Sequence, residues 1–483
     1  MHFSIVAKVL GVLLMLFSLL ANLPSVLISL IYQDQEIRSF LLALSITFVT
    51  GFLLWVSTAR TNEQLRTRDG FLIVTLFWSV LGTFGALPLY FSAELPLSVT
   101  DAVFESMSGL TTTGATVVTG LDDLPKSILF YRQQLQWLGG MGIIALAVAV
   151  LPMLGIGGMQ LYRAESPGPV KNDNLVPRLA ETAKALWYIY LGLTVACALA
   201  YWLAGMSLFD AICHSFSTVA IGGFSTHDAS MGFFDSHVIN LIATLFMFLA
   251  GINFALHFTA WQRRSVLQYL RDPETLFYAT ILAGVAVVTV GVLYFTQTYQ
   301  AWDAIVHGLF QAVSIATTTG FSTADFNSWP YALPYLLLYA AIIGACAGST
   351  GGGMKVIRIL LIFKQGLREV HRLIHPNSVI SVKLGKTLVP DRVIESVWGF
   401  FAVYVLVYLL LLLALLASGE DVLTAFSAVG ATLNNLGPGL EGVAANYASL
   451  PDYSKWVLCL AMLLGRLEIF TLLVLFLPTF WRR

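Results

Sequence analysis

Long apolar runs alternate with short polar segments over the whole chain. Runs of about 18 or more apolar residues are typical of helices that cross a membrane. We find about ten, at residues 5–32, 36–58, 71–92, 127–155, 185–205, 236–261, 275–297, 333–363, 393–418 and 453–478. The first run is too long for a cleavable signal peptide, and no small-residue cleavage site follows it, so we interpret it as a retained helix.

Four shorter apolar stretches lie between the long runs. They cover residues 100–111, 209–220, 302–317 and 421–433, and each is too short to cross a membrane. Stretches of about 10–14 apolar residues in a membrane protein suggest re-entrant helices. Each stretch is followed by a loop that contains glycine and then by another long run, so one helix, short helix, loop, helix unit recurs.

The four loops align on a single glycine. Their sequences are SGLTTTGAT, STVAIGGFS, SIATTTGFS and ATLNNLGPG, and the shared position is Gly114, Gly223, Gly320 and Gly437. The position six residues earlier holds Ser108, Ser217, Ser314 and Ala431. Spacings of 109, 97 and 117 residues between the glycines indicate an internal repeat. Repeats in membrane transporters usually surround the substrate path.

The repeat predicts an all-α polytopic membrane protein. Four pseudo-symmetric units of helix, pore helix, loop and helix are expected around a central pore, with two extra transmembrane helices at the N-terminus. The predicted divisions are 1–69 for the two N-terminal helices, then 70–160, 161–272, 273–390 and 391–483 for pore units 1 to 4.

Composition and charge agree with a membrane protein. Hydrophobic residues make up 57% of the chain and charged residues 11%, against about 25% charged in soluble proteins. The loops at 59–70, 162–184, 262–272 and 355–392, with the C-terminus, hold 20 of the 26 Lys and Arg residues. Basic loops stay in the cytoplasm, which predicts two cytoplasmic termini and an acidic outer face that attracts cations. The net charge of −1 gives no reason to expect a nucleic-acid partner.

The glycine loops are predicted to present backbone carbonyls to the pore axis. Irregular backbone at membrane depth is tolerated only where it lines a cavity or is buried in protein. Carbonyl oxygens suit a hard monovalent cation because they replace its hydration shell, and the negative C-terminal ends of the short helices add attraction. The predicted filter residues are Thr111, Thr112, Thr113, Gly114, Ala220, Ile221, Gly222, Gly223, Thr317, Thr318, Thr319, Gly320, Asn434, Asn435, Leu436 and Gly437.

The residue types in these loops fit that task. Glycine adopts backbone angles that a Cβ atom resists. Threonine is compatible with an extended backbone, and its hydroxyl supplies one more oxygen. The alternative is that the loops are tight turns between helices, with glycine serving geometry alone.

A glycine-rich stretch interrupts the long run at 333–363. The sequence AGSTGGGMK, residues 347–355, cannot hold a stable helix without support, because each glycine costs about 1 kcal/mol relative to alanine. We interpret it as a flexible intramembrane plug below the filter, and a packing kink between close helices is the alternative. The predicted gate residues are Gly348, Ser349, Thr350, Gly351, Gly352, Gly353, Lys355 and Arg466.

Arg466 lies near the middle of the last apolar run. A charge at that depth is costly unless it faces water or a partner. We interpret Arg466 as an electrostatic barrier to cations in the pore, and a buried structural salt bridge is the alternative. Glu468 is only two residues away and is expected on a different helix face.

No organic cofactor is predicted for this chain. GPGLEG at 437–442 has dinucleotide-loop spacing but lacks a preceding strand. The stretch at 347–355 fails the phosphate-loop pattern at Met354 and Val356. Two other functions are alternatives. An ion-coupled secondary transporter of another solute usually needs acids within its spans, where only Glu468 stands away from the span ends. An intramembrane enzyme needs a catalytic cluster that the sequence does not offer.

Together these motifs resemble the TrkH/TrkG/KtrB superfamily of potassium transporters, and its TrkH branch in particular. The resemblance covers essentially the whole chain and rests on GLTTTGAT, AIGGFSTHD, GACAGSTGGGMKVIRILLIFKQG at 344–366, ATLNNLGPG and GRLEIFTLL. It implies K+ as the transported ion and a homodimer in the lipid of the bacterial inner membrane. It also implies a cytoplasmic regulatory ring of the TrkA type that binds nucleotides; the basic loop 364–392 is placed to dock such a partner, or is simply solvated.

The loops depart from the T-V-G-Y-G sequence of potassium channels. Each keeps one of the two glycines, and the residues that follow it are Ala115, Phe224, Phe321 and Pro438. Fewer glycines and mixed neighbours predict weaker discrimination between potassium and sodium than in a channel with four identical strands.

Overall fold

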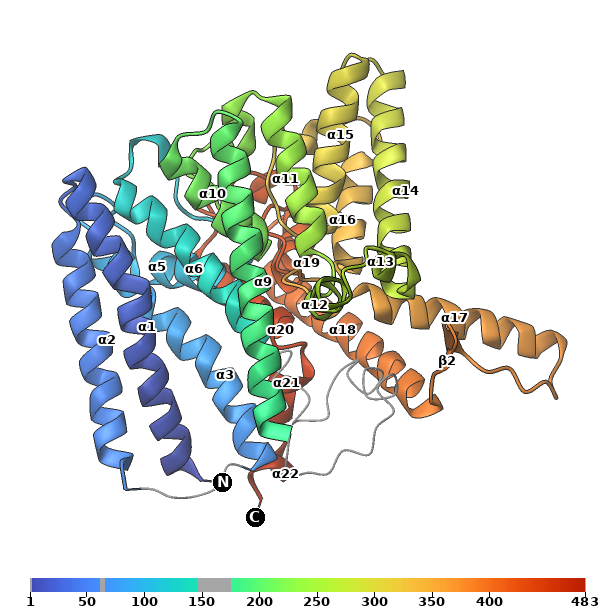
Figure 1. Ribbon diagram of the computed structural model, residues 1–483, viewed down its shortest axis with the longest axis horizontal. Coiled ribbons are helices and arrows are strands. Elements are labelled where there is room, and N and C mark those ends of the chain that lie inside the picture. Colours follow the sequence, from blue (N-terminus) through green and yellow to red (C-terminus); the bar gives the residue numbers. More distant parts are fainter. Residues whose placement is uncertain (1, 61–65, 146–174, 483) are drawn as a thin grey trace.

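The computed structural model describes residues 2–60, 66–145 and 175–482. These residues are mostly helical, and the one sheet among them is the antiparallel pair β1 (Lys383–Leu384) and β2 (Thr387–Leu388). The long helices run roughly side by side, and both chain termini lie at the same end of the molecule (Figure 1). Of the predicted basic loop 162–184, residues 162–174 lie outside the described part.

Six helices in the described ranges are long and apolar enough to cross a membrane. They are α1 (Phe3–Tyr32), α2 (Ile37–Thr58), α3 (Thr67–Phe84) continued by α4 (Leu87–Phe91), α9 (Leu175–Leu203), α14 (Pro273–Phe295) and α18 (Asp391–Ala417). Two more spans are counted if α11 (His237–Ala250) with α12 (Phe254–Arg263), and α20 (Asp452–Arg466) with the short helix α21 (Phe470–Leu473), are taken as bent pairs. These helices account for eight of the about ten predicted runs.

Three of the predicted runs are bent or divided, and a fourth is described only in part. The two bent pairs turn by 92° and 107°, so the runs at 236–261 and 453–478 are not straight helices. The run at 333–363 divides into α16 (Leu333–Ile343) and α17 (Val356–Ile374), because the glycines between them cannot continue a helix. The run at 127–155 begins as α6 (Lys126–Ala145), and its later residues lie outside the described part.

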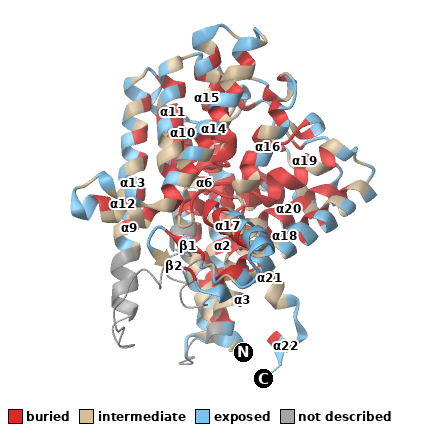
Figure 2. Ribbon diagram, turned by 90° about the vertical axis from the view of Figure 1, so that its right-hand side faces the viewer, coloured by how far each residue is buried: buried red, intermediate tan, exposed pale blue. Residues whose placement is uncertain are grey.

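Four short helices form the buried centre, where the red ribbon concentrates in Figure 2. They are α5 (Val99–Leu110), α10 (Leu208–Ala220), α15 (Ala301–Ala316) and α19 (Val422–Leu433). The first two begin with the same cap, in which the side chains of Ser98 and Ser207 accept a hydrogen bond from the N–H group three residues later. The Asp421 side chain caps α19 in the same way. The structure therefore contains all four predicted re-entrant helices, one in each pore unit.

The remaining short elements connect these units. They are α13 (Leu267–Arg271) before α14 and α22 (Pro478–Trp481) near the C-terminus. The helix α17 projects away from the body of the molecule (Figure 1). Its outer part exposes a row of apolar side chains, namely Phe363, Leu367, Val370, Leu373 and Ile374. We call this projecting helix the arm.

The two N-terminal helices pack together through glycine. A Cβ atom on Gly11 of α1 would lie 2.7 Å from the carbonyl oxygen of Gly51 in α2, and a Cβ on Gly51 would lie 2.7 Å from the carbonyl oxygen of Gly11. Small residues at a helix crossing let two backbones approach closely. No side chain larger than hydrogen fits at this crossing without separating the helices.

We expect Gly51→Ala to destabilise the protein by about 1–3 kcal/mol, because the added methyl group meets backbone atoms that cannot move aside. The melting temperature of the detergent-solubilised protein measures the effect. Gly284→Ala in α14 is the matched control, since nothing lies within 4 Å of its Cβ position and alanine favours a helix. Equal melting temperatures for the two variants would contradict the packing argument.

Candidate functional site

The four loop glycines form a closed ring. Each one lies against the carbonyl oxygen of the residue that precedes the glycine in the next loop. A Cβ atom would lie 2.0 Å from this oxygen for Gly114 against Gly222, 2.1 Å for Gly223 against Thr319, 2.1 Å for Gly320 against Leu436, and 2.7 Å for Gly437 against Thr113. The contacts run from unit 1 to 2, 3 and 4 and return to unit 1, so the loops surround one axis.

The same backbone conformation recurs in all four loops. The glycines have φ values of +82°, +80°, +84° and +97°, and the residues two positions earlier, Thr112, Ile221, Thr318 and Asn435, have φ between +52° and +69°. The residue between them donates its N–H to a carbonyl five residues back, at 2.8 Å in every loop, which is the hydrogen bond that closes a helix with a left-handed cap. Thr112 and Thr318 are therefore left-handed and not extended, and in each loop the two left-handed residues are separated by one that is not left-handed.

Most carbonyl oxygens of this ring have no hydrogen-bond donor among the described residues. Each loop contributes three carbonyl oxygens, which belong to its two left-handed residues and to the residue between them. Donors reach only the Gly222 oxygen, from Gln136 Nε2 at 2.6 Å, and the Gly437 oxygen, from the Tyr447 hydroxyl at 2.6 Å. Buried carbonyls usually find a donor because an unpaired one is costly. The ring is therefore a concentrated set of unmet acceptors, which a cation or water would satisfy.

The threonine hydroxyls mainly brace the loops. Thr111 and Thr113 hydrogen-bond each other at 2.8 Å, and Thr317 and Thr319 do the same. The hydroxyls of Thr111 and Thr317 also donate to backbone carbonyls of their own short helices, and the Thr113 hydroxyl accepts from Asn435 of the fourth loop. The remaining threonine of each triplet, Thr112 or Thr318, contacts the structures below the ring.

The glycine-rich segment 344–355 lies directly below the ring and contacts three of its four units. The Thr350 hydroxyl donates to the Val219 carbonyl at 2.9 Å in unit 2, and the Gly352 N–H donates to the Thr318 hydroxyl at 2.7 Å in unit 3. The Gly353 N–H donates to the Asn434 carbonyl at 3.1 Å in unit 4. A Cβ on Gly352 would lie 2.0 Å from that carbonyl oxygen, so the glycines allow the segment to fit against the ring.

Arg466 makes the contact to the first unit. Its Nη2 donates to the Thr112 hydroxyl at 2.5 Å and to the Thr350 carbonyl at 3.3 Å, and the side chain is 7% exposed. Its Nε has no hydrogen-bond partner, and no carboxylate pairs with Arg466 among the described residues. The alternative of a structural salt bridge therefore finds no support, and a positive charge lies at the inner end of the ring.

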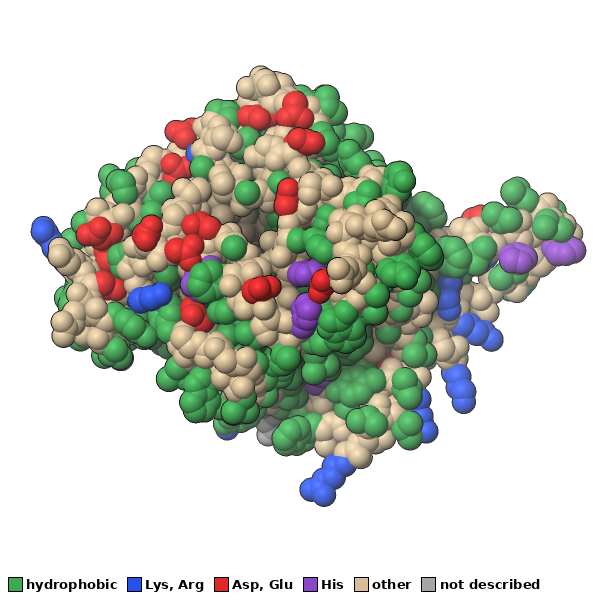
Figure 3. All heavy atoms as spheres, turned by 90° about the horizontal axis from the view of Figure 1, so that it is seen from above, with side chains coloured by type: hydrophobic (Ala, Val, Ile, Leu, Met, Phe, Trp, Pro, Cys, Tyr) green, Lys and Arg blue, Asp and Glu red, His purple; other side chains and the backbone are tan. Residues whose placement is uncertain are grey.

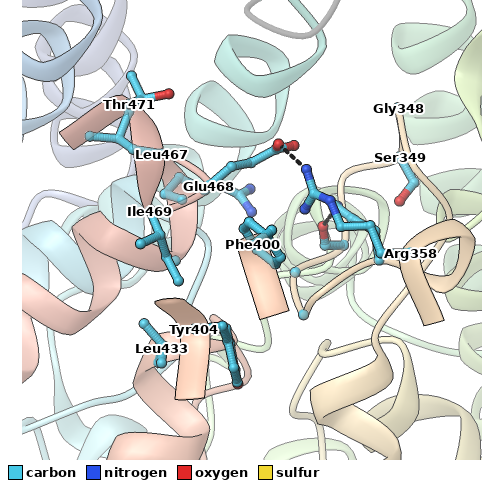
Figure 4. A pocket seen from close by; sticks show the side chains of 16 residues that line it. Gly348, Ser349, Arg358, Phe400, Tyr404, Leu433, Leu467, Glu468, Ile469 and Thr471 are labelled. Carbon is cyan, nitrogen blue, oxygen red and sulfur yellow. Dashed lines mark hydrogen bonds and ion pairs between the residues drawn. The ribbon is translucent and has the colours of Figure 1, made fainter. Parts of the chain in front are cut away.

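Glu468 pairs with Arg358 instead. The ion pair crosses a cavity below the ring (Figure 4), and Arg358 also lies 4.1 Å from the centre of the Phe400 ring. Glu468 follows the end of α20 in the 107° bend, which removes it from the helix face of Arg466. The cavity holds about 50 Å³ of water-accessible space and is lined by Gly348, Ser349, Lys355 and Arg466 among others. The sequence analysis did not identify Arg358 as a residue of this site. The signal that could have identified it is a charged residue in the first turn of α17.

The helix α6 braces the second loop with a row of buried polar side chains that sequence reasoning also missed. Gln136 Oε1 accepts from the Phe224 N–H at 3.1 Å, Gln133 Nε2 donates to the Phe224 carbonyl at 2.9 Å, and Arg132 donates to the Ser225 carbonyl at 3.2 Å. Arg132 is in turn paired with buried Glu105 at 2.7 Å. The available signal was the polar run RQQLQ inside an apolar segment.

Acidic side chains gather on the end of the molecule opposite the termini (Figure 3). Two of them, Asp303 and Asp421, lie at the starts of the short helices α15 and α19. The others lie in the loops that follow the short helices: Asp122, Asp228, Asp235, Asp325 and Glu441. Few Lys or Arg side chains share this face, whereas several lie along the arm and below it (Figure 3). The charge asymmetry read from the sequence is therefore present in the folded protein.

Residues 36–483 match the TrkH family, described as "Cation transport protein". The chain is 59% identical to the Trk system potassium uptake protein TrkH of Halomonas elongata and 56% identical to that of Escherichia coli, over 100% of each chain. It also superposes on the crystal structure of the potassium transporter TrkH from Vibrio parahaemolyticus with a TM-score of 0.93, at 53% identity and with full coverage of both chains.

His227 is expected to make stability depend on pH. Its Nδ1 lies 2.5 Å from Asp122 Oδ1 and its Nε2 3.6 Å from Asp210 Oδ1, while the His214 ring stacks beside it at 6.5 Å. Burial lowers the pKa of His227, but the interactions with the carboxylates of Asp210 and Asp122 outweigh burial and raise the pKa above 6.5. Because the folded pKa is raised, the stabilisation is complete below pH 6.5 and disappears as the pH rises through the folded pKa.

We therefore expect His227→Gln to lower the melting temperature by about 1–3 °C at pH 6 and to have no effect at pH 9. Melting curves of both proteins between these pH values measure the difference. His375→Gln, on the exposed end of the arm, is the control. A difference that persists unchanged at pH 9 would show that the imidazolium charge is not involved.

Proposed function

Since the chain belongs to the TrkH family of cation transport proteins, we propose that it takes up K+ across the bacterial inner membrane, as its relatives are named for potassium uptake. K+ passes through the ring of glycine loops, whose carbonyls act as the selectivity filter. The chain is a transporter and not an enzyme, because its full-length relatives are transport proteins. No organic cofactor takes part in this proposal.

The ring of unpaired carbonyls is the observation that carries the proposal. Four short helices end at the ring with their C-termini, where partial negative charge accumulates. Carbonyl dipoles replace the hydration shell of a monovalent cation without adding a fixed charge. The ring therefore offers a dehydrated cation an energetic environment similar to water, and offers an anion only repulsion.

The charge distribution supports inward transport. We propose that the acidic face in Figure 3 is the outer face, where it raises the local concentration of cations above the ring. The basic arm and both termini are then cytoplasmic, in agreement with the rule that basic loops remain inside.

We propose that the segment 344–355 and Arg466 form the gate. Together they contact all four units from below, and they occupy the route that an ion leaving the ring would take. The guanidinium group repels a cation at the point where the carbonyl dipoles end. Opening requires the segment and Arg466 to move away from the ring.

The arm supports the proposed partners. Its apolar face, which begins with Phe363 and ends with Ile374, is exposed on a helix that projects sideways from the body of the molecule (Figure 1), and we propose that a second copy of the chain covers it in a homodimer. The basic residues of 364–392 then lie beside that interface, where a nucleotide-binding regulatory ring of the TrkA type docks. Movement of the arm pulls directly on the segment 344–355, because α17 begins where the segment ends.

An ion-coupled transporter of a larger solute is the second candidate. Such a protein needs a mid-membrane pocket that encloses the solute. The cavity below the ring has about 50 Å³ of water-accessible space, which suits an ion or a few waters. The geometry therefore favours potassium.

Substitution of the ring glycines tests the proposed filter. We expect Gly114→Ser, Gly223→Ser and Gly320→Ser each to reduce the ratio of K+ to Na+ flux in liposomes by about tenfold, the effect of losing about 1.4 kcal/mol of discrimination. A serine Cβ displaces the neighbouring carbonyl that lies 2.0–2.1 Å from its position. Gly120→Ser is the matched control, since Gly120 also has positive φ but has no atom within 4 Å of its Cβ position.

Wild-type selectivity in all three ring variants would refute the filter assignment.

The same liposomes, with and without an imposed proton gradient, reveal the energy source of transport. Flux that follows the K+ gradient alone indicates a passive, channel-like mechanism.

We expect Arg466→Ala to raise K+ flux by about tenfold, because the positive barrier and one contact of the gate are removed together. Tracer uptake into liposomes that contain equal amounts of folded protein measures the change. Arg466→Lys keeps the charge and should remain near the wild-type flux. A folded Arg466→Ala protein with unchanged or lower flux would contradict the barrier.

A further inference from the structure

The second filter loop has a glycine at a position where the other three loops have a side chain. The residue before the ring glycine is Thr113, Thr319 or Leu436 in units 1, 3 and 4, but it is Gly222 in unit 2. A Cβ atom on Gly222 would lie 2.4 Å from both Cδ and Oε1 of Gln136. The amide of Gln136, which comes from α6 in unit 1, therefore occupies the space that a side chain of the filter loop takes in the other units.

Gln136 is held in a single orientation by two backbone groups. It is fully buried, its Nε2 donates to the Gly222 carbonyl at 2.6 Å, and its Oε1 accepts from the Phe224 N–H at 3.1 Å. A carbonyl can only accept and an N–H can only donate, so the reversed amide would lose both hydrogen bonds. The side chain thus bridges the residues on either side of Gly223.

The acceptor of this hydrogen bond is one of the four carbonyls that close the ring. The equivalent oxygens of Thr113, Thr319 and Leu436 receive no donor from the described residues. This level of the ring therefore has three carbonyls without a donor, which are free to turn toward an ion, and a fourth that is hydrogen-bonded to Gln136. We infer that Gln136 is a positioning residue for ion selectivity, acting through the Gly222 carbonyl, an inference that rests on the proposed filter.

The hydrogen bond has two effects on an ion in the ring. The positive N–H end of the donor offsets part of the field of the Gly222 oxygen at the ion, and the hydrogen bond restrains the oxygen from moving toward a smaller ion. Field strength and rigidity of the carbonyls are the two proposed sources of discrimination between K+ and Na+. Without the donor, no positive N–H group opposes the field of the oxygen and the oxygen is free to move, and both changes favour the smaller Na+.

Replacement of the donor by an apolar side chain of similar shape tests this inference. We expect Gln136→Met to lower the ratio of K+ to Na+ flux between about twofold and tenfold, the range that one net hydrogen bond represents. Gln133→Met is the matched control: Gln133 lies on the same helix and bonds the same loop, but its acceptor is the Phe224 carbonyl, beyond the ring glycine. We expect the control to keep the wild-type ratio even if total flux falls.

A second pair of variants separates selectivity from packing. Gly222→Ala alone should abolish transport, because the new methyl group overlaps the buried amide of Gln136. The double variant Gly222→Ala with Gln136→Ala removes the overlap and should restore folded, transporting protein. Its K+ to Na+ ratio should match that of Gln136→Ala and not that of the wild type, since the carbonyl still lacks its donor.

The outcomes distinguish this inference from the proposed filter. If Gly114→Ser alters selectivity but Gln136→Met and the double variant keep the wild-type ratio, Gln136 only supports the loop and the inference is overturned. If all of these variants, Gly114→Ser included, keep the wild-type ratio, the filter itself is wrong. Altered ratios in both Gln136→Met and Gln133→Met would also reject a specific role for Gln136, because any loosening of the loop would then suffice.

Discussion

The centre of this protein depends on backbone carbonyls that are buried and yet left without hydrogen-bond donors. Folding normally pairs such groups, and the cost of leaving them unpaired has to be offset by the surrounding structure. Here each loop is held by one strong hydrogen bond back into its own short helix, at 2.8 Å in all four units. Each loop also leans on the next through a glycine. The unmet acceptors that remain are the functional product of this packing.

The four loops perform one backbone task with different side chains, and the differences determine where the symmetry ends. Two of the ring carbonyls accept hydrogen bonds, from Gln136 in unit 2 and from Tyr447 in unit 4, whereas none of the ring carbonyls of units 1 and 3 has a donor among the described residues. Below the ring, one segment of unit 3 contacts three units and Arg466 of unit 4 contacts the first. A fourfold ring is thus combined with contacts below it that have no fourfold symmetry.

The sequence was sufficient to predict the repeat, the ring glycines and the interrupted helix, because these follow from local propensity and spacing. It did not predict the bends of 92° and 107°, because hydrophobicity alone does not report a bend within an apolar run. It also did not predict the left-handed conformation of Thr112 and Thr318, because that conformation follows from the cap at the helix end and not from threonine itself. The Arg358–Glu468 pair and the Gln136 bridge were missed because their partners lie 110 and 86 residues apart in the chain.

The ring is made from one chain, so it has a single seam, between units 4 and 1. Its contacts at that point are the loosest, with 2.7 Å for Gly437 against Thr113 compared with 2.0–2.1 Å elsewhere, and Asn435 bonds the Thr113 hydroxyl across 322 residues. Because synthesis runs from the N-terminus, the first loop is made long before Asn435 exists to close the seam. The ring therefore cannot be completed until the last unit has been made.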